Sequence, residues 1–297
     1  MSLEDLEAIR IKIVRKKLIC DIIGFVLGLI FLILTFNFIL FLFCFLLAVG
    51  IGTLISSPDV RAFKEEYKEN FVSSALAKIF DNLNYKPDGG IDKSLLAPLN
   101  MIDLGDRYDS NDYISGTYKG INVITADVHI EEERESTDSD GNRETYYVTL
   151  FMGRWMIFDF NKKFIRNCQV IQKGFDSSKT NRFGKDKYVR VEFEDVEFNK
   201  KFKVFAQNEE EAFYILTPAL IQRIKDLSNK LKGDLMLCFF DNKLHVGLDS
   251  NSDSFEPNFR VKVTEENLNQ TIAGDIKLIT DFVDELNLDN DLFKKGN

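Results

Sequence analysis

The chain has 297 residues, 45% of them hydrophobic, and a formal net charge of −9 at pH 7. This length allows one large domain or two small ones. Residues 1–17 carry a net charge of +2, so the remainder carries −11. An acidic body argues against nucleic acid as a partner and against a body that lies flat on anionic lipid.

Residues 18–55 are apolar almost throughout. As one helix they would be about 57 Å long, whereas the hydrocarbon core of a bilayer is about 30 Å thick. Two antiparallel helices that meet near Asn37, which is polar and turn-prone, fit this thickness better. We therefore expect a transmembrane helical hairpin that contacts the lipid bilayer.

Small residues lie at matching depths in the two arms of this hairpin. Gly24 and Gly28 lie in the first arm, and Ala48 and Gly52 lie in the second. Small residues let helix backbones approach closely in lipid, so these four predict the internal seam of the hairpin. The alternative is that glycine is simply common in membrane helices.

Basic residues flank the apolar stretch on both sides. They are Arg10, Lys12, Arg15, Lys16 and Lys17 before it, and Arg61, Lys64 and Lys68 after it. Positive residues near membrane ends stay cytoplasmic, so we expect both termini in the cytoplasm and the first group at the membrane interface. The apolar run is too long for a cleaved signal peptide. The four cysteines show no paired motif, which fits a reducing compartment.

Ser57-Pro58-Asp59 has the pattern of a helix start, with serine as N-cap and proline in the first turn. Apolar residues at helical spacing predict a stalk helix that runs to about Leu83. A cluster of breaker residues at 86–90 then predicts a boundary. The expected domains are a basic cytoplasmic segment (1–17), the transmembrane hairpin (18–55), a stalk helix and linker (56–90) and a cytoplasmic α+β domain (91–297).

From residue 112 onward, β-branched and aromatic runs predict a sheet. The expected strands are 113–118, 121–130, 146–152, 155–160, 164–171, 187–193, 202–206, 235–240, 243–248 and 259–263. Helices are expected at 93–99, after Asn208, between Thr217 and Gly233, and after Thr264. Strand runs followed by helices predict an α+β fold with a mainly antiparallel sheet packed against helices.

Candidate chemical motifs are weak. Residues 138–142 resemble a calcium loop, but the glycine is misplaced and the final glutamate is missing, so we expect a solvated hairpin loop. His129 and His245 lack metal-ligand spacing, and we interpret them as ordinary strand residues. Cys168 and Cys238 are expected to be buried structural thiols. We therefore assign no catalytic residue, no cofactor and no metal ligand.

Phenylalanine is abundant, with 27 residues. Outside the anchor, the predicted strands hold Phe158, Phe160, Phe164, Phe193, Phe198, Phe202 and Phe205. Aromatic side chains fill sheet cores well, which is the favoured interpretation. The alternative is a pocket that binds a lipid or another ligand.

Residues 191–205, followed by 211–218, resemble a bacterial family of domains of unknown function, DUF3137, as do 112–116 and 158–162. The signature residues are Phe198, Asn199, Lys200, Phe202, Leu216, Thr217 and Pro218. We interpret them as structural, with residues 199–201 as a polar turn between strands. Arg154 departs from the family pattern, so we expect its strand to be more exposed. The resemblance implies no activity.

The sequence thus predicts a membrane-anchored, cytoplasm-facing module in the bacterial inner (cytoplasmic) membrane, which binds a protein partner or self-associates. Enzymatic activity is left open but not favoured. The alternative is an inner-leaflet lipid-handling protein or an enzyme that uses a Phe-rich pocket. An apolar pocket with converging polar groups would favour the alternative, and a filled core with an exposed apolar patch would favour the first interpretation.

Overall fold

The structure is a computed structural model that describes residues 2–137, 141–159, 167–173, 188–286 and 288. The chain forms two compact units that interleave along the sequence. Met1–Ala75 and Phe255–Gly274 form the first unit, and Leu76–Ser254 and Asp275–Asn297 form the second. Each unit is described by itself below.

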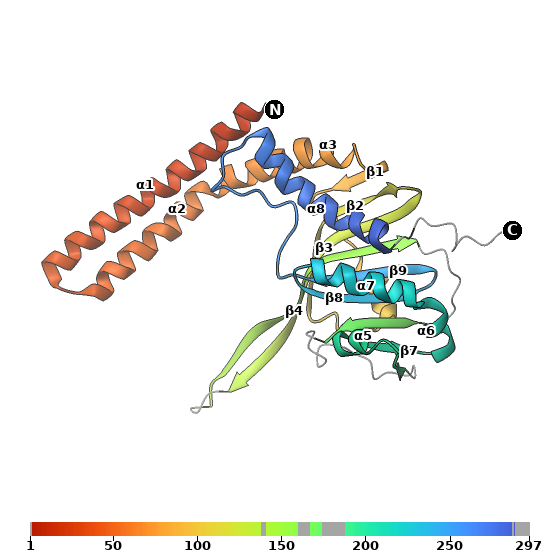
Figure 1. Ribbon diagram of the computed structural model, residues 1–297. Helices are drawn as coiled ribbons and strands as arrows, with labels where there is room; N and C mark the ends of the chain where they lie inside the picture. Colours follow the sequence, from red (N-terminus) through yellow and green to blue (C-terminus); the bar gives the residue numbers. More distant parts are fainter. Residues whose placement is uncertain (1, 138–140, 160–166, 174–187, 287, 289–297) are drawn as a thin grey trace. The chain divides into compact units, whose positions relative to one another are not determined.

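The first unit contains a helical hairpin of α1 (Leu3–Thr35) and α2 (Phe38–Glu66) (Figure 1). Phe36 has a left-handed backbone with φ 51°, which reverses the chain. The side chain of Asn37 then caps α2, accepting hydrogen bonds from the backbone N–H groups of Ile39 (3.0 Å) and Leu40 (3.3 Å). The predicted pair of apolar helices and its bend are therefore confirmed.

Both helices extend beyond the apolar stretch. Ser2 caps α1 and shares a capping box with Asp5, so the basic segment is helical from its start. The predicted helix start at Ser57 is wrong, because α2 continues through Pro58. Proline cannot donate to the carbonyl four residues earlier, but the Ser57 hydroxyl donates to this Leu54 carbonyl at 2.9 Å. This bond replaces the missing one and keeps the helix intact.

The stalk helix is shorter than expected. A π-helical turn (Tyr67–Val72) and α3 (Ser73–Leu76) follow α2. The helix therefore ends at Leu76 and not at Leu83. Asp81–Lys86 is an extended strand, β1, which the helical spacing of its apolar residues concealed.

The expected strand at 259–263 is also wrong. Within the first unit this segment is held by side chains of α1 and α2 and makes no strand pairing. Arg10 donates to the Phe259 carbonyl at 3.0 Å, and the Val263 N–H donates to Glu7 at 2.8 Å. The rings of Phe63 and Phe259 lie 5.0 Å apart. Side-chain hydrogen bonds thus replace a sheet ladder.

The second unit is built on a nine-stranded sheet with the order β1-β2-β3-β4-β9-β8-β5-β7-β6, in which all neighbours are antiparallel. The strands after β1 are β2 (Arg107–Tyr118), β3 (Ile121–Thr137), β4 (Arg143–Asp159), β5 (Cys168–Gln172), β6 (Val189–Val191), β7 (Phe202–Ala206), β8 (Asp234–Phe240) and β9 (Lys243–Asp249). The α+β class and the antiparallel sheet are therefore confirmed. β4 is one continuous strand, although two were expected, and parts of the expected 155–160, 164–171 and 187–193 strands lie outside the described residues.

Helices cover both faces of this sheet. On one face, α7 (Pro218–Lys230) and the second-unit part of α8 (Glu265–Leu286) pack against strands, and Phe158 stacks on Phe282 with ring centroids 6.1 Å apart (Figure 1). On the other face, α4 (Lys93–Leu96) and a 3-10 turn (Ala97–Leu99) cover a core that contains Trp155 and Met236. The central part of the sheet is thus buried on both sides, whereas the ends of β3 and β4 near residues 133–137 and 143–146 are exposed.

Two short helices flank the far end of the sheet. α5 (Val196–Lys201) occupies the segment expected to be a polar turn, so that prediction is wrong. Asp195 caps α5 by accepting from the Phe198 N–H at 2.9 Å. α6 (Glu209–Ile215) is capped by Asn208, as predicted.

Candidate functional site

The hairpin places its small residues at close helix contacts. A Cβ built on Gly24 would overlap the Cβ of Ala48, so this predicted pair meets directly. Gly28 faces Phe41 instead, and Gly52 faces Cys20. A Cβ built on either glycine would lie 2.9 Å from the partner side chain, which is closer than ordinary van der Waals contact. The three glycines are buried. Their role as the functional seam of the hairpin stays a prediction.

The two helices also form an open apolar groove of about 340 Å³, which we call the hairpin groove. It is lined by Cys20, Ile23, Gly24, Leu27, Phe31, Cys44, Leu47, Ala48, Ile51 and Ile55. Its lining contains no charged residue. The groove follows the contact between the helices on one side of the hairpin.

Three of the five predicted interface cations have partners within the first unit. Lys12 and Lys16 both contact the Asp59 carboxylate, at 2.8 and 2.6 Å, and thereby join α1 to α2. Their hydrogen bonds lower the pKa of Asp59. Arg10 pairs with Glu7 at 2.6 Å, and this bond raises the pKa of Arg10.

The other two cations differ from these three. Arg15 is exposed and Lys17 is half-buried, and neither makes an ion pair within the part of the chain that the structure describes. Lys17 lies on the side of α1 that faces α2, because its Cα is close to the Gly52 position (3.7 Å from a built Cβ). Of the five cations in residues 10–17, these two are therefore the ones without an ion pair among the described residues.

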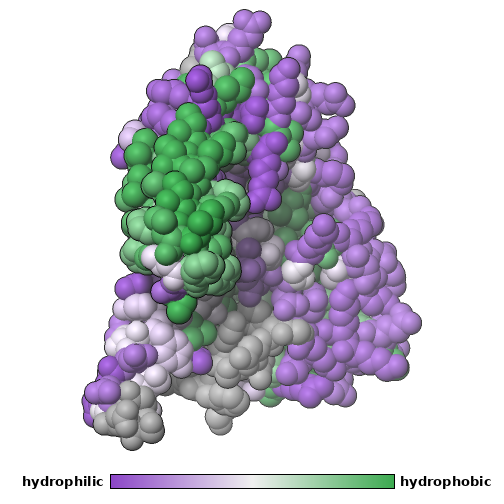
Figure 2. All heavy atoms as spheres, turned by 90° about the vertical axis from the view of Figure 1, so that its left-hand side faces the viewer, coloured by the Kyte–Doolittle hydropathy of each residue, from purple (hydrophilic) through white to green (hydrophobic). Residues whose placement is uncertain are grey.

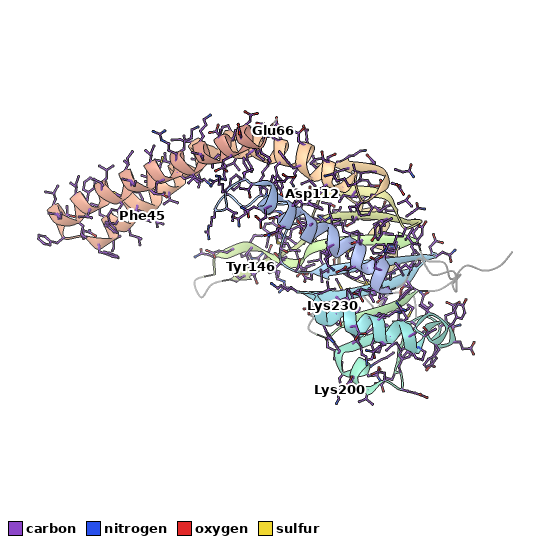
Figure 3. The ribbon with its side chains drawn as sticks, turned by 45° about the horizontal axis from the view of Figure 1, so that its top comes forward. Phe45, Glu66, Asp112, Tyr146, Lys200 and Lys230 are labelled. Carbon is purple, nitrogen blue, oxygen red and sulfur yellow. The ribbon has the colours of Figure 1, made fainter. Side chains whose placement is uncertain are left out.

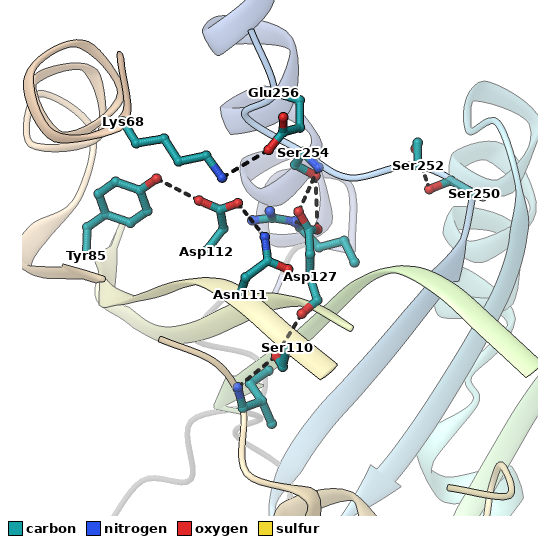
Figure 4. A network of polar contacts seen from close by, with 12 residues as sticks. Lys68, Tyr85, Ser110, Asn111, Asp112, Asp127, Ser250, Ser252, Ser254 and Glu256 are labelled. Atoms are coloured by element: carbon teal, nitrogen blue, oxygen red, sulfur yellow. Dashed lines mark hydrogen bonds and ion pairs between the residues drawn. The ribbon is translucent and has the colours of Figure 1, made fainter. Parts of the chain in front are cut away.

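In the second unit, a buried polar cluster surrounds Arg154. This residue is 1% exposed, so the expectation of an exposed strand is wrong. It lies opposite Asp127 in the β3–β4 ladder and donates to this carboxylate at 2.9 Å. Ser254 donates to the same carboxylate through its N–H (2.6 Å) and its hydroxyl (3.2 Å) (Figure 4). Burial of the charge is tolerated because the pair is hydrogen-bonded.

Asp112 extends this cluster from an irregular position in β2, where its φ is 54°. It accepts hydrogen bonds from the Tyr85 hydroxyl (2.7 Å) and the Asn111 amide (2.9 Å) (Figure 4). Burial alone would lower the pKa of Arg154, but Asp127, Asp112 and Asp275 together raise it. The guanidinium therefore stays charged. Sequence reasoning missed this cluster, although an arginine inside an apolar strand was its visible signal.

The histidines and cysteines do not converge on one site. His129 is half-buried near Thr149, whereas His245 is buried opposite Cys238 in the β8–β9 ladder. Burial raises the pKa of Cys168 to about 12 and that of Cys238 well above its usual value. Neither thiol is therefore activated as a nucleophile. Among the described residues, no group of three or more His, Cys, Asp or Glu side chains could hold a metal ion.

The signature residues lie around α5, α6 and the start of α7. Phe198 and Phe202 are buried, with ring centroids 5.1 Å apart. Asn199 makes two hydrogen bonds with the backbone of Phe193, at 2.5 and 3.1 Å. These contacts hold the segment before α5 against the helix.

The rest of the signature is at the surface or at a helix start. Lys200 is exposed at the end of α5 (Figure 3). Leu216 is buried, Thr217 caps α7 by accepting from the Leu220 N–H at 3.3 Å, and Pro218 is the first residue of α7. The geometry of these residues is that of packing and capping.

Residues 149–288 match the family described as "Protein of unknown function (DUF3137)". This part of the chain belongs to that family. It extends from β4 to the end of α8 and contains the whole signature. The family description assigns no activity, so it transfers no catalytic residue.

One solved structure similar to this chain is the "crystal structure of the mycobacterial trehalose monomycolate transport factor A, TtfA". The two chains are 10% identical, the alignment covers 76% of this chain and 94% of that chain, and the TM-score is 0.42. A likeness of this degree carries no argument about function. No curated protein matches this chain in sequence.

Gly24 and Gly50 form a matched pair for testing the helix contact. A leucine at Gly24 would collide with Ala48, whereas Gly50 has open space around its Cβ position. We expect Gly24→Leu to lower the free energy of unfolding by about 1–3 kcal/mol and Gly50→Leu to change it little. Denaturation of the full chain in detergent micelles measures both. Equal effects would contradict close packing at Gly24.

Asp127 keeps the charge of Arg154 compensated. We expect Asp127→Asn to lower the free energy of unfolding by about 3 kcal/mol, because it breaks a buried ion pair. The exposed Asp109 on β2 provides the control, since Asp109→Asn makes the same chemical change in water. Denaturant titration of the two variants compares them. A loss no larger than that of the control would show that Asp127 is not needed as a charge.

His245 makes stability depend on pH. Burial, with a smaller effect of Lys243, lowers its pKa from 6.5 to about 4. Between these values the unfolded chain binds the proton more readily, so stability is complete above about pH 6.5 and falls by up to about 3 kcal/mol toward pH 4. We expect His245→Leu to remove this part of the dependence, while His129→Leu leaves it. Unfolding curves at several pH values test this, and an unchanged slope in His245→Leu rejects it.

Proposed function

We propose that this chain is a membrane-anchored binding or assembly protein, in which the α1–α2 hairpin inserts into a lipid bilayer. In this proposal the second unit faces the cytoplasm and binds a protein partner or another copy of the chain. The observation that carries the proposal is the exposed apolar surface of the hairpin.

In each hairpin helix, the apolar stretch of 18 residues that could span a membrane is only 11% (first helix) or 6% (second helix) buried. Core helices of water-soluble proteins are mostly buried, so these helices do not resemble them. The hydrophobic residues of the hairpin gather in one green surface in Figure 2. Phe36 at the bend is 90% exposed. Lipid is the solvent in which such a surface is stable.

The dimensions and charges also support insertion. Residues 18–35 and 38–55 each give about 27 Å of helix, close to the hydrocarbon thickness. The cations of residues 10–17 and 61–68 lie beyond the same end of the hairpin, and the bend carries none. The positive-inside rule then favours both chain termini on the cytoplasmic side, which in a bacterium means the inner membrane.

Binding is favoured over the Phe-rich pocket by the packing of the sheet. Phe158, Phe198 and Phe202 are buried and contact other aromatic rings, so they fill the core. Phe160 and Phe164 lie outside the described residues. By contrast, Phe213 on α6 is 47% exposed although it contacts Phe193, with ring centroids 5.0 Å apart. Exposed aromatic residues of this kind are typical anchors of protein interfaces.

Reporter fusions in a bacterium test the topology. Alkaline phosphatase, which is active only in the periplasm, is fused after Asn37 or after Asn297. We expect activity after Asn37 and none after Asn297, with a fluorescent protein giving the reverse pattern. A periplasmic signal after Asn297 would overturn the orientation.

Extraction of the full chain from membranes tests the binding role. We expect recovery with a stoichiometric partner or as an oligomer, and Phe213→Ser should reduce the bound fraction about tenfold, as loss of one anchor residue does. Tyr146 on the ribbon formed by β3 and β4 is equally exposed (46%), so Tyr146→Ser is the control (Figure 3). Recovery of wild type as a lone monomer would argue against the binding role.

A further inference from the structure

The hairpin groove has the size and lining of a ligand site. Its volume of about 340 Å³ lies at the lower end of the usual range for small-molecule sites. It runs from Cys20 to Phe31 on α1 and from Ile55 to Cys44 on α2. Eleven residues of helix span about 17 Å, so the groove is long and parallel to the helix axes. An extended hydrocarbon chain fits this form.

A cation lies at one end of the groove. Lys17 precedes Cys20 by three residues, which places the two on the same face of α1. It is half-buried, and it makes no ion pair within the described residues, whereas Lys12 and Lys16 share Asp59. Asp21, four residues after Lys17, lies beyond ion-pair distance of it in the described structure. Lys17 is thus able to pair with an external anion.

From this combination we propose that the hairpin groove binds one acyl chain of an anionic phospholipid, with the phosphate of its headgroup at Lys17. The charge of Lys17 complements the anion, and the uncharged lining complements the tail. The acyl chain would run along the helices, as chains do in a bilayer. This inference rests on the proposed insertion of the hairpin, and it adds a selective lipid site to the anchor.

Photolabelling of the full chain in lipid vesicles tests the site. The probe is phosphatidylglycerol with a photoreactive group on its acyl chain, in phosphatidylcholine vesicles, and a phosphatidylcholine probe is the parallel reagent. We expect the first probe to label peptides that contain groove residues more strongly than the second. Equal labelling by both probes would mean bulk bilayer contact only and would overturn the proposal.

Two matched pairs of variants localise the binding. Lys17→Gln should reduce phosphatidylglycerol labelling about fivefold, the factor expected for one basic residue near a membrane surface. Arg15→Gln removes the same charge on the opposite side of α1 and should leave labelling unchanged. Leu47→Trp fills the groove and should abolish labelling, whereas Leu54→Trp, which lies outside the lining, should not. Equal effects within either pair would overturn the proposal.

The native cysteines separate this inference from the proposed function. Cys20 and Cys44 line the groove, so in an inserted hairpin they should resist a membrane-impermeant maleimide. Reaction of both thiols would overturn membrane insertion and the lipid site together. Protected thiols without selective labelling would overturn the lipid site alone. Disulfide formation between Cys44 residues of two copies under oxidation would assign the groove to a second copy instead.

Discussion

The hairpin depends on satisfying every backbone hydrogen bond in a segment whose side chains are mostly apolar. Asn37 provides acceptors at the bend, and Ser57 supplies the donor that Pro58 lacks. These side-chain hydrogen bonds replace backbone bonds that are missing at the bend and at the proline. α1 and α2 continue well past the apolar stretch as unbroken helices. Lys12 and Lys16 then join the two helices through Asp59 in the part that lies beyond it.

The second unit contains a buried pair of opposite charges, Asp127 and Arg154, that must likewise be compensated inside the protein. Its sheet is covered on both faces, yet β3 and β4 bring Asp127 and Arg154 into the interior. The pair is stable because Asp127 also accepts two hydrogen bonds from Ser254, and because Asp112 and Asp275 add favourable electrostatic interactions with Arg154. A buried charge of this kind restricts the strands to one register, since a shift by one residue would separate the pair and place it on the opposite face.

Local signals in the sequence predicted much of this fold. The bend at Asn37 and the cap at Thr217 follow from short-range chemistry. Other features of the fold depend on contacts that the local sequence pattern does not reveal. Pro58 lies within a helix because a neighbouring hydroxyl replaces its donor, and β1 forms because β2 offers a partner edge. Arg154 is buried because a residue 27 positions away pairs with it, and no local pattern contains that information.

The interleaving of the two units has a practical consequence for dissecting this protein. A water-soluble fragment that begins at residue 91 omits β1, and with it the phenol that binds Asp112. The same cut removes Glu7 and Phe63, which contact residues 255–274 within the first unit. Such a truncation therefore exposes the edge of β2 and leaves residues 255–274 without the helices that they contact. Expression trials should retain the N-terminal helices and solubilise the intact polypeptide in detergent.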